Sequence, residues 1–362
     1  MVEIQQASIM MLLSGIFTGI VFGFILQRGR YCMNSAFRDV VYINDTTLFK
    51  VWLLSLSIAI VGANLMEDMG LLGDFGLRRQ SFNIIANMVG GYIFGVGMVM
   101  TGGCGSGVIY RMGEGYVSSL LAVLGFGLSL VATYHGPLKP VMDFLKGFKI
   151  NIESGDEAVL NPALWDLIGG HDVKWAVIAV VAAFMMAYVL KGRLFAHKPK
   201  KGYLPGVTGI LIGVIVIFAL WASYYWGGQT RGLSVAGPMS EATLMFVMGD
   251  SMSRFDTMFN FWGVFKGTWS ALYIIGIPVG AYISARGLSE YRLHTPPADE
   301  LVRVFGGSLL MGFGAAVAGG CTIGHALTGM STLALSSITT TIFIMLGCWT
   351  MVYFMFVKKS VV

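Results

Sequence analysis

Residues 94–107 read F-G-V-G-M-V-M-T-G-G-C-G-S-G, and residues 311–324 read M-G-F-G-A-A-V-A-G-G-C-T-I-G. At a constant offset of 217, six of the fourteen positions match; five are glycine and the sixth is a cysteine, Cys104 in one copy and Cys321 in the other. The two copies therefore share a glycine-dependent backbone conformation and one thiol. Two copies of such an element within apolar segments are typical of transporters built from two halves around a central site.

The composition is that of an integral membrane protein. The 362-residue chain is 56% apolar and 12% charged, with a mean hydropathy of +0.73, whereas soluble domains are about 45–50% apolar and about 25% charged. A net charge of +5 is modest and does not suggest nucleic acid. The four cysteines show no C-x-x-C or Cys/His spacing, so we expect no metal, no disulfide framework and no cofactor. The N-terminus lacks the positive region of a signal peptide.

Segments of the chain that can cross a bilayer need roughly 20 apolar residues each. Shorter, glycine-interrupted apolar stretches are typical of half-helices that enter the membrane and are sheltered by protein or by a water-filled cavity. We predict an all-α integral membrane protein, a single transmembrane domain over 1–362, with about nine transmembrane helices plus short re-entrant half-helices. The spans are expected at about 8–27, 48–66, 82–101, 116–134, 173–191, 206–226, 268–285, 303–321 and 332–357, and the half-helices near 31–43, 104–115, 234–249 and 321–330.

The order of the spans predicts two inverted, pseudo-symmetric halves. We assign residues 1–134 to the first half, 135–205 to a connecting loop, an extra helix and a basic inner loop, and 206–362 to the second half. Nine spans place the termini on opposite sides. With the N-terminus outside and the C-terminus in the cytoplasm, 15 of the 24 Lys and Arg residues lie on inner segments, including five in 191–201, as the positive-inside rule requires. The two glycine-rich copies then cross the membrane in opposite directions.

Three of the four cysteines lie in glycine-rich breaks, and this position decides their interpretation. Cys104 and Cys321 follow Gly-Gly pairs, and Cys32 lies in Q-R-G-R-Y-C-M-N-S just after the first span. A thiol is a soft, weak hydrogen-bond donor and acceptor, suited to a sulfur-rich substrate. One buried cysteine is more often a small packing residue, but three cysteines in breaks favour a substrate pathway. Cys348 lies within the last span and is interpreted as a packing residue.

Candidate anion-binding groups surround these cysteines. Backbone N–H groups beside glycine form concavities that favour anions, and we expect Gly103 and Gly320 to adopt the unusual backbone angles that only glycine allows; Gly105 belongs to the same group. Arg28 and Arg30 fit an electropositive funnel and fit membrane anchoring equally well. Two further residues, Arg231 as a funnel residue and His325 as an anion donor or a structural histidine, complete the set.

No energy-coupling motif is visible in the sequence. There is no G-x-x-x-x-G-K-[ST] segment for ATP, and no isolated acidic residue lies deep within a predicted span. Carboxylate-based proton or sodium coupling is therefore not expected from the sequence.

Four stretches of the chain carry a family resemblance. They are Q-R-G-R-Y-C-M-N-S-A-F-R-D (27–39), G-G-Y-I-F-G-V-G-M-V-M-T-G-G-C-G-S-G-V-I-Y-R-M-G-E-G (90–115), G-L-S-V-A-G (232–237) and G-G-S-L-L-M-G-F-G-A-A-V-A-G-G-C-T-I-G-H-A-L-T-G (306–329). They resemble the YeeE/YedE family of membrane proteins, in particular its members for thiosulfate uptake. The resemblance covers both halves and implies an hourglass shape with a narrow waist. It also implies that Cys32, Cys104 and Cys321 pass thiosulfate through transient S–H···S hydrogen bonds. The family's third stretch has an arginine where this chain has Gln229, which leaves Arg231 as its substitute.

The resulting prediction is a transporter rather than an enzyme, which moves thiosulfate inward across the inner membrane for sulfur assimilation. In family terms, a small cytoplasmic sulfur-carrier protein of the TusA type is a partner. Three alternatives stay open at this stage. They are transport of another sulfur or selenium species, a membrane thiol-redox enzyme that needs a cysteine pair able to form a disulfide, and a passive channel for hard anions that needs no thiols.

Overall fold

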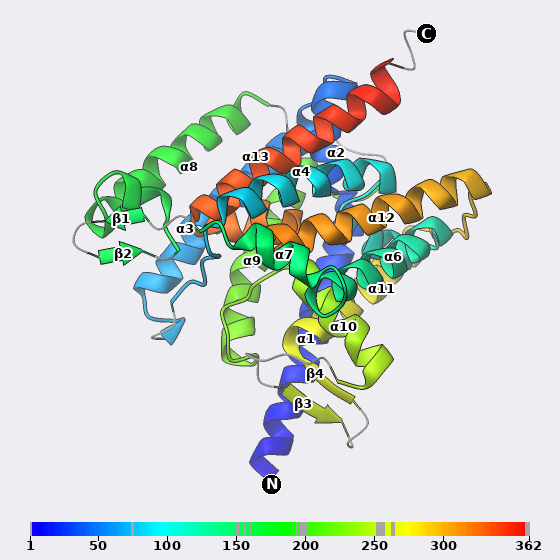
Figure 1. Ribbon diagram of the computed structural model, residues 1–362, viewed down its shortest axis with the longest axis horizontal. Helices are drawn as coiled ribbons and strands as arrows, with labels where there is room; N and C mark the ends of the chain where they lie inside the picture. Colours follow the sequence, from blue (N-terminus) through cyan, green and yellow to red (C-terminus); the bar gives the residue numbers. More distant parts are fainter. Residues whose placement is uncertain are drawn as a thin grey trace.

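The structure is a computed structural model (Figure 1). It describes residues 2–73, 76–149, 152–154, 157–159, 161–192, 194–195, 201–250, 258–261 and 265–358. Arg193, Lys198 and Lys200 of the basic segment 191–201 lie outside the described residues. The prediction of an all-α membrane protein is confirmed.

Helices make up most of the first half, whereas the connecting segment combines two helices with a small hairpin and two 3₁₀ turns. The first half contains α1 (Val2–Gly29), α2 (Met33–Tyr42), α3 (Thr47–Asp68), α4 (Ile84–Thr101), α5 (Gly105–Glu114) and α6 (Val117–Tyr134). The connecting segment contains α7 (Lys139–Lys146), the antiparallel strands β1 (Ile152–Ser154) and β2 (Glu157–Val159), the 3₁₀ turns η2 (Leu164–Leu167) and η3 (His171–Val173), and α8 (Lys174–Leu190).

The second half repeats the pattern of long helices and short, broken ones. It contains α9 (Pro205–Tyr225), α10 (Ala236–Met248), the antiparallel strands β3 (Met258–Phe261) and β4 (Phe265–Thr268), α11 (Trp269–Gly287), α12 (Ala298–Ala318), the π-helix η4 (Ile323–Gly329), α13 (Leu335–Val352) and a second π-helical turn, η5 (Tyr353–Val357). The two small hairpins were not predicted. The four predicted half-helices correspond to α2, α5, α10 and η4.

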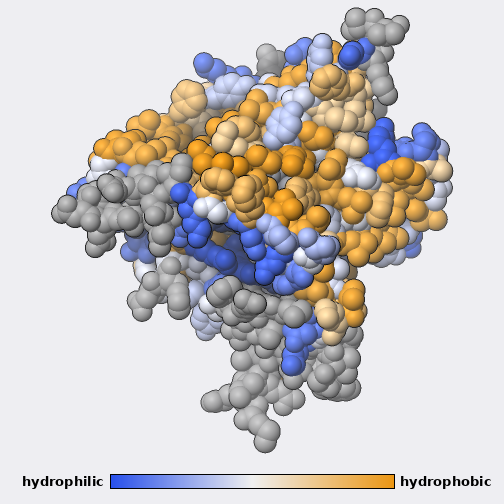
Figure 2. All heavy atoms as spheres, in the orientation of Figure 1, coloured by the Kyte–Doolittle hydropathy of each residue, from blue (hydrophilic) through white to orange (hydrophobic). Residues whose placement is uncertain are grey.

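Among the described residues, eight helical segments are long and apolar enough to cross a membrane. One of the nine expected spans, 268–285, exists as α11 but is not among these eight segments. It contains Pro278 and ends with Arg286 in its last turn, and twelve of its nineteen residues are buried. Protein rather than lipid thus surrounds much of α11, which explains how a less apolar helix occupies this position. The apolar outer surface lies over α12, α13 and α6 (Figures 1 and 2).

Glycines bring the long helices into close contact. A Cβ atom on Gly19 or Gly23 of α1 would lie within 2.1 Å of a backbone oxygen of α11, and one on Gly280 of α11 would meet α1 equally closely. The same holds between α4 and α12, where Gly90 approaches Ala318 and Gly97 approaches Met311. Because residue numbers rise along one helix as they fall along the other, α4 and α12 run antiparallel. Small residues at such crossings let backbones pack without side chains between them.

The helix pairs exchange partners between the halves. The offset of 217 also carries α3 approximately onto α11 and α6 onto α13. In the structure α4 packs along α13 and α12 packs along α6, while α1 packs along α11 and α9 along α3. In all four pairs the two helices run parallel, because residue numbers rise together along the close contacts. Each half thus supplies helices that complete the other half, and both cysteine-bearing breaks lie where the halves meet.

Candidate functional site

Both glycine-rich segments end a helix at the same point of the repeat. α4 ends at Gly102 with φ +77°, and α12 ends at Gly319 with φ +87°, a left-handed conformation that favours glycine at a helix C-terminus. The prediction that Gly103 and Gly320 adopt this conformation is wrong, because the left-handed residue is the first of each Gly-Gly pair.

The second glycine of each pair is required for space instead. A Cβ atom on Gly320 would lie 2.9 Å from Cδ2 of His325, and one on Gly103 would lie 3.2 Å from Cγ1 of Val108. A Cβ atom on Gly105 would lie 3.2 Å from Cγ1 of Val235. These glycines let the chain turn back closely after each break.

Each of the three predicted pathway cysteines lies at the start of a short helix. Cys32 and Cys104 are the N-cap residues of α2 and α5, and the Cys321 carbonyl accepts the first helical hydrogen bond of the η4 segment, from His325 N–H at 2.8 Å. All three side chains are almost fully buried. The first N–H groups of a helix have no partner within it, so these positions suit an anion or a polarised sulfur.

The structure brings Cys32 and Cys104 together, although they are 72 residues apart. Their Sγ atoms are 3.6 Å apart, and Cys104 Sγ lies 3.5 Å from the hydroxyl of Ser106. Gly107 forms the wall beside them: a Cβ atom there would lie 2.6 Å from Cys32 Sγ and 3.3 Å from Cys104 Sγ. Cys32, Cys104 and Ser106 thus form a row of three hydrogen-bonding side chains, two of which are soft thiols. The described cysteines form no disulfide.

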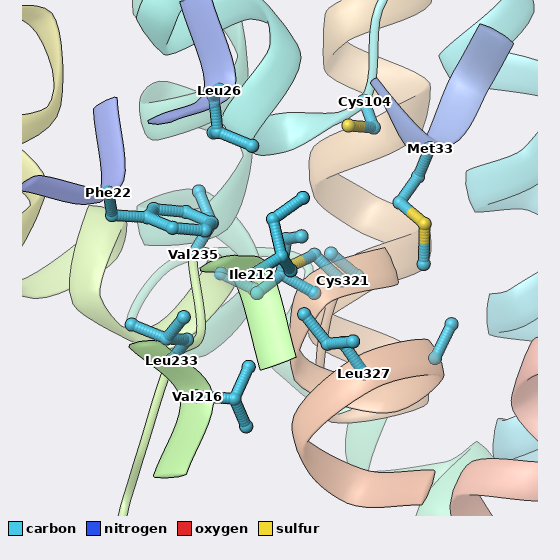
Figure 3. Close-up of a cluster of buried hydrophobic side chains, with 14 of the residues drawn as sticks. Phe22, Leu26, Met33, Cys104, Ile212, Val216, Leu233, Val235, Cys321 and Leu327 are labelled. Carbon is cyan, nitrogen blue, oxygen red and sulfur yellow. The ribbon is translucent and has the colours of Figure 1, made fainter. Parts of the chain in front are cut away.

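Cys321 lies apart from this pair, where two helix N-termini converge. The start of η4 meets the segment that leads into α10, because a Cβ atom on Gly324 would lie 3.0 Å from Ser234 Oγ. The backbone amides of Val235, Ala236, Ile323 and Gly324 favour negative charge on the Cys321 sulfur. The side chain of Val235 extends toward Gly105, next to Cys104. Figure 3 shows Cys104 and Cys321 on one buried cluster with Val235, Ile212 and Leu327. The two cysteines therefore border the same apolar cluster.

A polar cavity of about 860 Å³ opens beside the Cys321 break. Its lining includes Gly319, Gly324 and Ser234 around the break, together with five basic side chains. In Figure 2 a hydrophilic region borders the apolar surface near α7, which supplies two of the five. The sequence predicted all five on the outer side of the membrane, and the structure gathers them around one cavity. They are Arg78, Arg79, Lys139, Lys146 and Arg231.

Arg231 is held by an acidic residue that the sequence did not single out. Its Nη1 lies 2.6 Å from Oε1 of Glu241, whose Oε2 accepts a hydrogen bond from Thr268 Oγ1 at 2.6 Å. Glu241 is buried within α10. A buried carboxylate in a half-helix was a recognisable signal, because such residues are rare in membrane segments unless paired.

Arg28 and Arg30 lie away from the described lining of this cavity, near the ends of α9 and α11. Arg28 stacks over the rings of Phe24 and Tyr203, and Arg30, with φ +47°, pairs with Glu290 at 2.6 Å. A different arginine approaches the thiols: Arg111 donates from Nη1 to the Gly102 carbonyl at 2.6 Å and so caps the C-terminus of α4.

His325 is fully buried and both of its ring nitrogens have partners within the protein. Nδ1 lies 3.1 Å from Ser337 Oγ, and Nε2 lies 3.1 Å from the Ala318 carbonyl. Because a carbonyl only accepts, Nε2 carries the proton and Nδ1 accepts from the serine. This arrangement ties η4 to α12 and α13 and favours the structural alternative for His325. Cys348 is likewise buried within α13, against α4, as a packing residue.

Buried helices in close contact, a basic cavity and thiols placed at helix breaks define a membrane transporter. The family model described as "Sulphur transport" matches residues 28–350. The chain is 32% identical to the thiosulfate transporter TsuA of Spirochaeta thermophila over 96% of this chain and 99% of that protein. It is 29% identical to the thiosulfate transporter TsuA of Escherichia coli K12 over 97% and 96%, and 29% identical to the probable transporter YedE of the same bacterium over 34% and 30%.

The chain therefore belongs to the Sulphur transport family and is a transporter, not an enzyme. The predicted resemblance to the YeeE/YedE family is confirmed.

Proposed function

We propose that this protein carries thiosulfate inward across the inner membrane for sulfur assimilation. Two full-length relatives are named thiosulfate transporters. The observation that carries the proposal is the position of Cys321, a buried soft sulfur at a helix break beside a cavity with five basic side chains. Thiosulfate joins a terminal sulfur to a sulfonate head, and each part has a matching group at this point.

The basic cavity collects the dianion and lowers the free energy of bringing charge to the protein surface. At its base, the Cys321 thiol donates a weak hydrogen bond to the terminal sulfur, while N–H groups at the starts of α10 and η4 bind the sulfonate oxygens. The ion then passes the apolar side chains around Val235 and reaches the Cys32–Cys104 pair. Every step exchanges hydrogen bonds, and no covalent bond to sulfur forms.

The two halves, 1–134 and 206–362, are proposed to be related by inversion about an axis in the membrane plane. The antiparallel contact of α4 with α12 and the exchange of helix partners support this relation. The basic residues around the cavity then lie outside, the C-terminus lies in the cytoplasm, and the waist of the hourglass lies at Val235. A TusA-like sulfur carrier is proposed to accept the sulfur at the inner face.

The test is uptake of thiosulfate labelled in its terminal sulfur into proteoliposomes that contain the purified protein. We expect time-dependent accumulation that protein-free vesicles lack, and competition by unlabelled thiosulfate but not by sulfate at ten-fold excess. Equal competition by sulfate would indicate a general channel for hard anions. Stronger competition by selenosulfate than by thiosulfate would assign the pathway to a selenium species.

A further inference from the structure

Two carboxylates meet around one buried amide at the end of α1. Gln27 is fully buried, and its Nε2 donates to Oε1 of Glu114 at 3.1 Å and to Oε2 of Glu290 at 3.2 Å. Glu290 also accepts from Arg30 at 2.6 Å and is 16% exposed. Glu114 ends α5, whereas Glu290 lies in the loop after α11, so that residues 176 positions apart share one amide group.

This network has more hydrogen-bond acceptors than donors. The two N–H groups of the Gln27 amide are directed to two carboxylates, and its own Oε1 is buried without a partner among the described residues. A buried carbonyl oxygen without a donor destabilises the structure, because it has lost its hydrogen bonds to water without replacing them. Rotating the amide would direct that oxygen at two carboxylates, which repels unless one is protonated. One added proton supplies the missing donor once the amide is rotated, because the protonated carboxyl can then donate to that oxygen.

The network connects directly to Cys32 and Cys104, the inner thiol pair in the proposed orientation. The Gln27 carbonyl accepts the Arg30 N–H at 3.1 Å in the turn that leads to Cys32. Glu114 ends the same ten-residue helix that Cys104 begins. Two of the elements that hold this network therefore also hold Cys32 and Cys104.

Inward movement of a dianion needs a source of energy. An inside-negative membrane potential opposes the entry of both negative charges of the dianion, and each proton that enters with the dianion cancels one of them. The sequence did not predict carboxylate-based coupling, because no isolated acidic residue lies deep within a predicted span, but the structure brings two carboxylates from separate segments to one buried amide.

We propose that the Glu114–Gln27–Glu290 network binds a proton when thiosulfate occupies the inner thiol pair, and that this proton enters the cell with the substrate. The inference rests on the proposed function. A bound dianion raises the proton affinity of both carboxylates, because its negative charge attracts the proton. By the same linkage, the bound proton raises the affinity of the site for thiosulfate. The charged and titratable groups that interact with the two carboxylates are Arg30, Tyr110 and Arg111, and the backbone N–H of Arg292 donates to the Glu114 carbonyl.

The experiment uses the full-length protein in proteoliposomes with the membrane potential clamped. Exchange of labelled for unlabelled thiosulfate at equal pH reports the pathway alone, and net uptake with the interior one pH unit more alkaline reports coupling. We expect the pH gradient to raise the initial net uptake at least five-fold in the unmodified protein and less than 1.5-fold in Glu114→Gln. Glu300→Gln, which removes an exposed carboxylate that faces Arg303, is the matched control and should keep the full response.

A second measurement does not depend on any variant. Calorimetric titration of thiosulfate in two buffers of different ionisation enthalpy should show uptake of about one proton per bound ion. No proton uptake, or net uptake that follows a sodium gradient instead of the pH gradient, would overturn the proposal. Absence of exchange in the unmodified protein would instead contradict thiosulfate transport itself.

Discussion

Replacing Gly107 with alanine places a methyl group against both inner thiols. The added Cβ would lie 2.6 Å from Cys32 Sγ, roughly 1 Å closer than an optimal nonbonded contact of about 3.5–4.0 Å. One sulfur must therefore move by about 1 Å, which lengthens the 3.6 Å contact to Cys104 beyond hydrogen-bonding reach. Overpacking of this kind destabilises a protein by about 1–3 kcal/mol, so we expect Gly107→Ala to reach the membrane folded.

We expect Gly107→Ala to lower the initial rate of thiosulfate uptake at least ten-fold, which corresponds to about 1.4 kcal/mol. Gly306→Ala is the matched control, because a Cβ atom at Gly306 would have no neighbour within 4 Å. Both variants are assayed in proteoliposomes at equal protein content, with a thermal unfolding curve for each. If Gly107→Ala transports at the normal rate, substrate does not need contact between Cys32 and Cys104.

Three further predictions concern charge, pH and redox chemistry. Burial lowers the pKa of Lys146, on α7 at the basic cavity, to about 8; its ammonium group loses its charge as the pH rises through that value, so the KM for thiosulfate should rise between pH 7 and pH 9 in the unmodified protein and stay flat in Lys146→Arg. Arg231→Gln should raise the KM several-fold and Glu241→Gln should lower it, both more strongly at low ionic strength, and equal effects of the two would contradict a role for net cavity charge. Uptake should survive a strong reductant, and mass spectrometry should find no Cys32–Cys104 disulfide during turnover; loss of uptake together with that disulfide would indicate a redox cycle.

The local sequence predicted the helices and the breaks because both depend on short-range patterns. Apolar length placed the spans, and the Gly-Gly-Cys repeat placed the breaks at Cys104 and Cys321. The left-handed backbone conformation was predicted one residue too late, at Gly103 and Gly320, whereas Gly102 and Gly319 adopt it. Either glycine of a pair can end a helix, and the choice depends on which position needs space against Val108 or His325.

Contacts between distant segments could not be predicted from local sequence patterns. The approach of Cys32 to Cys104 depends on how the end of α1 lies against α5, and the cavity gathers basic residues from three separate segments. The network around Gln27 joins α1, α5 and the loop after α11. In each case the residues look ordinary in their own segment, and only the packing of the helices brings them together.

The most direct test of the central claim is the initial rate of uptake of thiosulfate, labelled in its terminal sulfur, by a Cys104→Ser, Cys321→Ser double variant. Serine keeps the size and the hydrogen-bond donor but replaces a soft sulfur with a hard oxygen. If thiols pass the terminal sulfur along the pathway, the rate should fall to that of protein-free vesicles while the unfolding curve stays unchanged. A rate within two-fold of the unmodified protein would show that the pathway does not depend on sulfur-to-sulfur contact.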